Sequence, residues 1–216
     1  MALSKIQSES INLADDFTFT GTVAGAGEPS DYVLLATTNI TSSTASVSFD
    51  GYYSATYKNY KILISNLSPV STTPIRFRFR RSNADVTVSN YFGHVINAYY
   101  RQGIGYGVAS SGQEWGASSG QLSVANVSGT GVQTAQSEIT IYDPLSTSFN
   151  KHISHITNFY SDEGYVSNIF GNYFLNDNSN AHSGITFFAT SGNIVNGNFK
   201  LYGIKWKKLL IILKLI

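Results

Sequence analysis

The sequence predicts an all-β protein that folds as an antiparallel β-sandwich of the jelly-roll-like kind, with an extended N-terminal arm and a short apolar C-terminal tail. Short runs of alternating apolar and polar residues recur along the chain, separated by turn-forming residues, and this pattern is typical of half-buried strands. The 19 glycines, 14 tyrosines and 13 phenylalanines, beside only one methionine, favour strands and turns over helices. No run of residues before the tail has helical periodicity.

Residues 1–30 are predicted to form the arm. Phe17 and Phe19 belong to a run of alternating apolar and polar residues, and a joint containing Gly and Pro follows at residues 25–29. A single strand without a hairpin partner leaves its backbone hydrogen-bonding groups unpaired. We therefore expect the arm to pair with a neighbouring chain or with another protein. The apolar residues expected to anchor it are Ile11, Leu13, Phe17 and Phe19.

Residues 31–205 are predicted to form the sandwich. Its clearest strand begins at Ile75, where strict alternation points Ile75, Phe77 and Phe79 toward the core and the intervening arginines outward. Turn clusters, such as residues 82–85 and 192–193, separate the strands. In chain order, we expect strands at residues 32–36, 45–49, 60–65, 75–80, 91–99, 120–125, 138–142, 152–159, 165–174, 184–189 and 198–204.

Residues 206–216, WKKLLIILKLI, are predicted to form a basic, apolar tail. The tail is shorter than the roughly 20 residues that a membrane-spanning helix needs. We expect it to be a final strand or a segment buried on a partner subunit, with an interfacial membrane helix as the alternative. A membrane is therefore not an expected partner.

The charged fraction of 12% is about half of the share that is usual in a soluble domain. Ser, Thr, Asn and Gly supply the polar surface instead, and such a surface suits subunits that pack together because it has little self-repulsion. The absence of cysteine excludes disulfides and thiolate metal sites. The net charge of +1 gives no argument for nucleic acid as a partner.

No pattern of residues predicts a catalytic site, a metal site or a cofactor. His152 and His155 are three positions apart, so a strand places them on opposite faces, where they cannot chelate one ion. The glycine-rich run at residues 103–107 does not match a dinucleotide-binding loop, and no nucleophile elbow is present. We therefore expect a protein that is not an enzyme. The alternative is a hydrolase, which would need two carboxylates across a cleft from among Asp50, Glu114, Asp143 and Asp177.

The segment 99–120 is the best candidate for recognition, and its Gly and Ser content predicts a loop. Aromatic side chains beside charged and amide groups suit stacking against sugar rings, and they are also typical of protein interfaces. We favour a subunit interface and keep a glycan site as the alternative. The candidate residues are Tyr99, Tyr100, Arg101, Tyr106 and Trp115.

A second candidate surface is a basic face on the strand that begins at Ile75. Guanidinium groups bind carboxylates well, so this face could bind an acidic partner, but a solvated outer face is the commoner outcome. Its residues are Arg76, Arg78 and Arg80.

Five stretches of the chain resemble a family of phage virion proteins, of the structural or tail-fibre type, from marine and freshwater phages including cyanophages. They cover most of the chain in the family's order: SESINLADDFTFTGTVAGAG, YVLLATTNITSSTASVSF, YSATYKNYKILISNLSPVS, EITIYDPLSTSFNKHISH and GITFFATSGNIVNGNFKLYGIK. The family pattern usually ends near LYGIK, and this chain departs from it by adding WKKLLIILKLI. The resemblance carries over no functional residues.

This resemblance implies a β-sandwich in a virion, assembled as a homo-oligomer, commonly a trimer, and attached to other virion proteins through the arm. The expected function is that of a structural protein: a tail fibre, a tail appendage or a head decoration. The alternative is a glycan-binding adhesin module, with a host-surface glycan as its partner.

Overall fold

The computed structural model describes residues 31–101, 103–123, 127, 134–161 and 164–205. The chain divides into two compact units, residues 1–30 and 31–216. The predicted arm with Ile11, Leu13, Phe17 and Phe19, and the predicted tail, lie outside the described residues.

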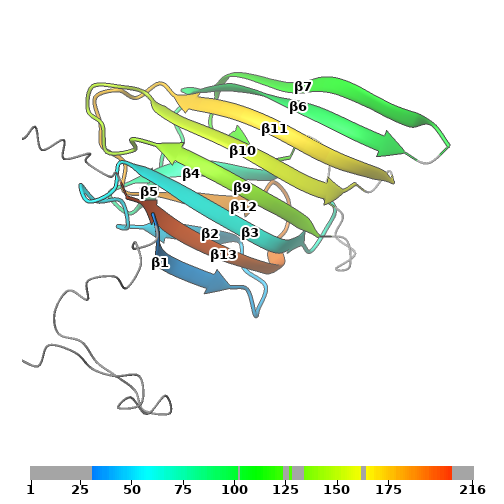
Figure 1. The fold of residues 1–216 in the computed structure, drawn as a ribbon, viewed down its shortest axis with the longest axis horizontal. Coiled ribbons are helices and arrows are strands. Elements are labelled where there is room, and N and C mark those ends of the chain that lie inside the picture. The colour runs from blue at the N-terminus through cyan, green and yellow to red at the C-terminus, as the bar shows by residue number, and fades with distance from the viewer. Residues whose placement is uncertain (1–30, 102, 124–126, 128–133, 162–163, 206–216) are drawn as a thin grey trace, which may run out of the picture. The chain divides into compact units, whose positions relative to one another are not determined.

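The second unit is an all-β sandwich, as predicted, built from two antiparallel sheets (Figure 1). The described residues include no helix, and thus none long and apolar enough to cross a membrane. The larger sheet has eight strands in the order β1 (Tyr32–Asn39), β13 (Ile194–Ile204), β3 (Asn59–Pro69), β9 (Ala135–Tyr142), β10 (Lys151–Tyr160), β11 (Tyr165–Leu175), β6 (Tyr91–Arg101) and β7 (Gly105–Ala117).

The smaller sheet packs against one face of the larger sheet. Its strand order is β2 (Ser46–Asp50), β12 (Gly184–Ala189), β4 (Ile75–Arg81) and β5 (Ala84–Asp85), and β8 (Gly120–Gln121) also pairs with β4. All of these pairs are antiparallel. The predicted strand at residues 120–125 is thus shorter than expected in the described part of the chain.

Aromatic side chains from β4 and β12 join the two sheets. The side chains of Ile75, Phe77 and Phe79 are buried while the arginines between them point away from the core, as the alternation predicted. The Phe77 ring meets the Tyr173 ring of β11 edge-on at 5.6 Å. In β12, the Phe187 ring lies 5.8 Å from the Phe199 ring of β13. These contacts span the space between the sheets, where burial of apolar surface stabilises the fold.

The buried phenol of Tyr91 connects β6 to the smaller sheet by hydrogen bonds. Its hydroxyl donates to the carbonyl of Val86 at 2.9 Å and accepts from the Phe79 amide at 2.9 Å. Burial raises the pKa of Tyr91, so this hydroxyl remains a donor throughout the ordinary pH range. Both hydrogen-bonding functions of a fully buried hydroxyl are thereby satisfied.

The tight turn between β4 and β5 explains why turn-forming residues stand at this point in the sequence. Ser82 and Asn83 both have positive φ, 52° and 62°. Two consecutive left-handed residues form the hairpin turn whose twist matches that of the flanking strands. The turn predicted at residues 82–85 is therefore confirmed at Ser82 and Asn83, whereas Ala84 and Asp85 form the strand β5, which was not predicted.

The prediction of a loop at residues 99–120 was wrong, because most of this segment forms the hairpin of β6 and β7. The chain reverses at Gly103, which has a φ of +81°. Gly107 faces Tyr99, and a Cβ atom there would lie only 2.7 Å from the Tyr99 hydroxyl. Gly107 therefore reflects a close approach by an aromatic ring, whereas Gly105 and Gly116 adopt positive φ values of 102° and 69°.

We expect Phe79→Ala to lower the free energy of unfolding by about 3–5 kcal/mol, because it opens a cavity between the sheets. Phe149→Ala is the matched control: Phe149 is 70% exposed and Phe79 is fully buried, so the control should change stability by less than about 0.5 kcal/mol. Denaturant unfolding of both variants measures the difference. Equal effects would contradict the assignment of Phe79 to the core.

Candidate functional site

The outward-facing surface of β10, β11, β6 and β7 carries half of the exposed large hydrophobic side chains of the described residues. We call it the outer face. In antiparallel strands, side chains that are directly opposite lie side by side, so the register arranges the outer face in rows across the strands. Three rows are apolar: the first is His152, Phe174, Phe92 and Trp115; the second is Ile156, Phe170 and Ile96; the third is Tyr160, Val166, Tyr100 and Tyr106.

The first row is a continuous line of aromatic rings. The Phe92 and Phe174 rings stack at 5.2 Å with 14° between their planes. Trp115 meets Phe92 edge-on at 5.0 Å, and His152 lies 5.9 Å from Phe174 at the other end. These are favourable geometries for aromatic pairs. Trp115 is nevertheless 89% exposed, so most of its indole surface is left uncovered.

The second and third rows expose aliphatic and aromatic side chains in the middle and at the far end of the same strands. Phe170, at the centre of the second row, is 45% exposed. In the third row Val166 is 60% exposed, and the Tyr100 and Tyr106 rings lie 6.4 Å apart. Rows of polar side chains separate the apolar ones. They consist of Ser154, Asn172 and His94, and of Asn158 and Asn168, whose row ends in the apolar Ala98 and Val108.

The outer face carries almost no charge. None of the outward-facing residues of β6, β10 and β11 is Asp, Glu, Lys or Arg. The charged side chains beside the outer face, Lys61 of β3 and Glu138 of β9, form an ion pair with each other. An open hollow on the face is lined by His94, Tyr142, His152, Asn172 and Phe174. Depletion of charge is what distinguishes the centre of protein interfaces from ordinary surface.

The structure divides the predicted recognition residues between two faces of the hairpin. Tyr100, Tyr106 and Trp115 lie on the outer face. Tyr99 and Arg101 point to the opposite side, where the Tyr99 ring meets the Tyr165 ring edge-on at 5.0 Å and Arg101 donates to the Tyr165 hydroxyl at 3.1 Å. Strand alternation separates the two groups, so the five residues cannot form a single site.

Sequence reasoning missed most of the outer face. The signal was present in β11, where Ile169 and Phe170 are adjacent apolar residues that must point to opposite sides of the sheet. Apolar residues at both odd and even positions of one strand indicate that both faces of the strand make contacts. The residues that were missed are Phe92, Ile96, Ile156, Val166, Phe170 and Phe174.

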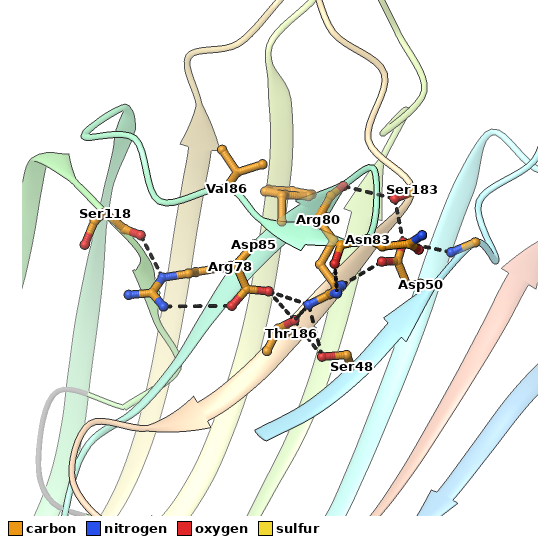
Figure 2. Close-up of polar contacts among 12 residues, drawn as sticks. Ser48, Asp50, Arg78, Arg80, Asn83, Asp85, Val86, Ser118, Ser183 and Thr186 are labelled. Atoms are coloured by element: carbon orange, nitrogen blue, oxygen red, sulfur yellow. Dashed lines mark hydrogen bonds and ion pairs between the residues drawn. The ribbon is translucent and has the colours of Figure 1, made fainter. Parts of the chain in front are cut away.

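The predicted basic face lies on the outside of the smaller sheet, and its arginines are paired within the chain. Figure 2 shows Arg80 between two carboxylates: its Nε lies 2.8 Å from Asp50 Oδ2 and its Nη1 lies 2.6 Å from Asp85 Oδ1. Arg78 lies 3.8 Å from Asp85, and Arg76 lies 3.0 Å from Glu114. The positive charge of this face is thus balanced by neighbouring acids.

The network around Arg80 also affects Asp50. Burial alone would raise the pKa of the Asp50 carboxyl, but hydrogen bonds from Ser183 and Arg80, with the attraction of Arg80, lower it overall. Thr186 extends the network, because it accepts from Arg80 at 2.9 Å and donates to Asp85 at 2.7 Å. The network therefore joins β2, β12, β4 and β5 across the smaller sheet (Figure 2).

The four acids considered for a hydrolase do not share a site. Each of them pairs with a different basic side chain: Asp50 with Arg80, Glu114 with Arg76, Asp143 with Lys58 and Asp177 with Arg81. In the described part of the chain, no group of three or more His, Asp or Glu side chains is placed to hold a metal ion. The acids at residues 162–163 and 15–16 lie outside the described residues.

Two of the histidines are buried among core residues. His155 points inward and His152 outward, as strand alternation predicted. Burial lowers the pKa of His155 to about 4. Burial likewise lowers the pKa of His182 to about 4, although its Nε2 lies 3.5 Å from the Asp177 carboxylate. Both rings are therefore neutral at pH 7.

Comparisons of this chain with protein-family models, with curated proteins and with solved structures find no match.

We expect acid to destabilise the fold through the buried histidines. Their folded-state pKa of about 4 is below the ordinary value of 6.5, so the unfolded chain binds more protons and stability is lost as the pH falls from about 6.5 to 4. Each histidine should contribute about 3 kcal/mol to the difference in unfolding free energy between pH 7 and pH 4.

His155→Phe should reduce that difference by about 3 kcal/mol, as measured by denaturant unfolding at the two pH values. Ile153→Val, in the same strand and also buried, is the control and should lower stability by the same amount at both pH values. An unchanged difference in the His155 variant would refute this account.

Proposed function

We propose that this chain is a structural subunit of a bacteriophage particle, a tail fibre, tail appendage or head decoration protein, which assembles with copies of itself through the outer face. The observation that carries the proposal is the uncharged, row-patterned apolar surface on β10, β11, β6 and β7. Large apolar side chains gathered on one uncharged face are typical of protein interaction sites. The assignment to a phage particle is supported by the sequence resemblance described above.

The size of the sheet supports a stable association. At about 4.8 Å spacing and with eight residues at about 3.4 Å rise, the four strands of the outer face cover about 520 Å², and all eight strands of the sheet cover about 1,000 Å². A standard protein interface buries about 800 Å² on each partner. Exposed apolar side chains continue beyond β10, on β3 and β1, where Leu63 is 38% and Leu34 is 53% exposed. The outer face together with the outward side of β9, β3, β13 and β1 is thus as large as one side of a standard interface.

The rows support copies of this chain as the partner. A symmetry axis parallel to the strands places each row at the same height in every copy. Apolar rows then meet apolar rows, and the rows containing asparagine meet one another, where their amides can exchange hydrogen bonds. The same match holds for the three copies that the resemblance implies. An unrelated partner would need to reproduce this alternation of rows.

The self-assembly is tested by Phe170→Asp, which places a charge at the centre of the outer face. Burying an unpaired carboxylate is strongly unfavourable, so the variant should associate at least about 100-fold more weakly, a loss of about 2.7 kcal/mol or more. Light scattering should give the mass of a trimer for the native chain and of a monomer for the variant. The variant should also be missing from purified virions by mass spectrometry.

Phe149→Asp is the matched control, since Phe149 is 70% exposed and lies in the loop between β9 and β10. It should assemble like the native chain. A native chain that stays monomeric at all concentrations, or a Phe170 variant that enters virions normally, would overturn the proposal.

A second candidate function, glycan binding, is favoured by the exposed indole of Trp115. The ring lies at the end of the aromatic row and packs edge-on against Phe92. A flat aromatic surface of this kind suits stacking against a sugar ring. Trp115→Ala should then weaken binding on a glycan array by at least about tenfold, whereas Trp115→Phe should keep most of it. An array without any bound glycan would exclude this candidate.

A further inference from the structure

The free edge of β7 is the longest unprotected sheet edge in the described part of the chain. β7 is the last of the eight strands, runs for 13 residues, and no described strand pairs with its other side (Figure 1). Its residues GYGVASSGQEWGA include no proline, lysine or arginine. The single charge, Glu114, is engaged by Arg76 at 3.0 Å. Free edges of this kind readily accept another strand.

The other sheet edges of this unit are blocked or short. β1 carries a bulge between Leu34 and Ala36, and bulges interrupt pairing. β2 has only five residues. The outer side of β4 is occupied by β5 and β8. β7 has irregularities of its own between residues 111 and 117, but it keeps an unbroken register over residues 105–111, opposite residues 95–101 of β6.

We infer that residues 17–23 of one copy, FTFTGTV, add as a strand to the free edge of β7 in another copy; this rests on the self-assembly proposed above. The segment is long enough for its residues 17–22 to pair with residues 105–110, six of the seven residues in the regular part of β7. It alternates apolar and polar residues and contains no charge. Strand addition supplies backbone hydrogen bonds, and alternate side chains supply specificity.

The side chains at the edge favour one register. Tyr106 is 89% and Val108 is 73% exposed, and neither has a cross-strand neighbour on its free side among the described strands. Antiparallel addition with Phe19 opposite Val108 places Gly21 opposite Tyr106. Phe19 then continues the outer face, and cross-strand pairs between aromatic and β-branched residues are stabilising. A slip of one residue would direct the phenylalanines to the other face of the sheet.

The chain between Val23 and Tyr32 is too short for residues 17–23 to reach the β7 edge of their own copy. The nine peptide units from Val23 to Tyr32 span at most about 32 Å. Tyr32 begins β1, at the opposite edge of the sheet from β7. A strand added beyond β7 lies eight strand spacings from β1, about 38 Å. In the antiparallel register Val23 also lies beside the Gly105 end of β7, whereas the sheet register aligns Tyr32 with the Trp115 end. The donor must therefore be another copy.

Because the chain has no cysteine, engineered disulfides can test this pairing directly. Phe19→Cys in one chain and Val108→Cys in a second chain of different mass are co-expressed and mildly oxidised. Directly opposite residues bring their Cβ atoms within disulfide distance, so we expect a cross-linked species with the summed mass of the two chains. Thr20→Cys is the matched control: it adjoins Phe19 but faces the other side, so it should cross-link to Val108→Cys at most one tenth as much.

A chain carrying both Phe19→Cys and Leu34→Cys tests the competing site, the β1 edge of the same copy. Efficient closure of a disulfide within that single chain would overturn the inference, as would equal cross-linking by the Thr20 control. Light scattering of the same samples separates the two proposals. An intact oligomer without the Phe19–Val108 cross-link refutes strand addition alone, and a monomer refutes the self-assembly together with it.

Discussion

The antiparallel register of the eight-stranded sheet is the constraint on which the other features of this protein depend. Because side chains alternate along each strand and align between strands, one register determines both the buried core and the rows of the outer face. Tyr173 and Phe174 show the consequence within two residues: the first packs against Phe77 in the core, and the second stacks against Phe92 outside. Any change of register by one residue would exchange these surfaces.

The outward sides of the two sheets differ in their content of charged residues. On the smaller sheet, arginines and carboxylates neutralise one another in partly buried pairs, and the Arg80 network ties four strands together. On the larger sheet the outward positions of β6, β10 and β11 carry no charge at all. A surface without charged groups is inexpensive to desolvate, whereas paired ions lose water at a substantial cost. This contrast is why we assign assembly to the larger sheet.

The outer face and the β7 edge are complementary parts of the same assembly. The outer face supplies apolar area, and the burial of this area is a non-directional interaction that determines how strongly the copies associate. The edge offers backbone donors and acceptors, whose direction sets how an added strand lies. Tyr106 and Val108 belong to both, because they end the rows of the outer face and border the free edge. A strand that carries Phe19 to this border would join the two surfaces into one.

The all-β class, most of the strands and the inward direction of Phe77 and Phe79 followed from the sequence alone, because period-two alternation depends only on local geometry. The opposite directions of His152 and His155 followed for the same reason. The tertiary structure alone decided that residues 105–117 form a strand, since pairing with β6 outweighs the Gly and Ser content of this segment, and Gly107 there lies close to the Tyr99 ring. It alone decided that Arg76, Arg78 and Arg80 are paired, and that Phe92, Phe174 and Phe170 lie in rows. Those features depend on which strands are neighbours and in which register they pair. Both are determined by contacts between segments that are far apart in the chain.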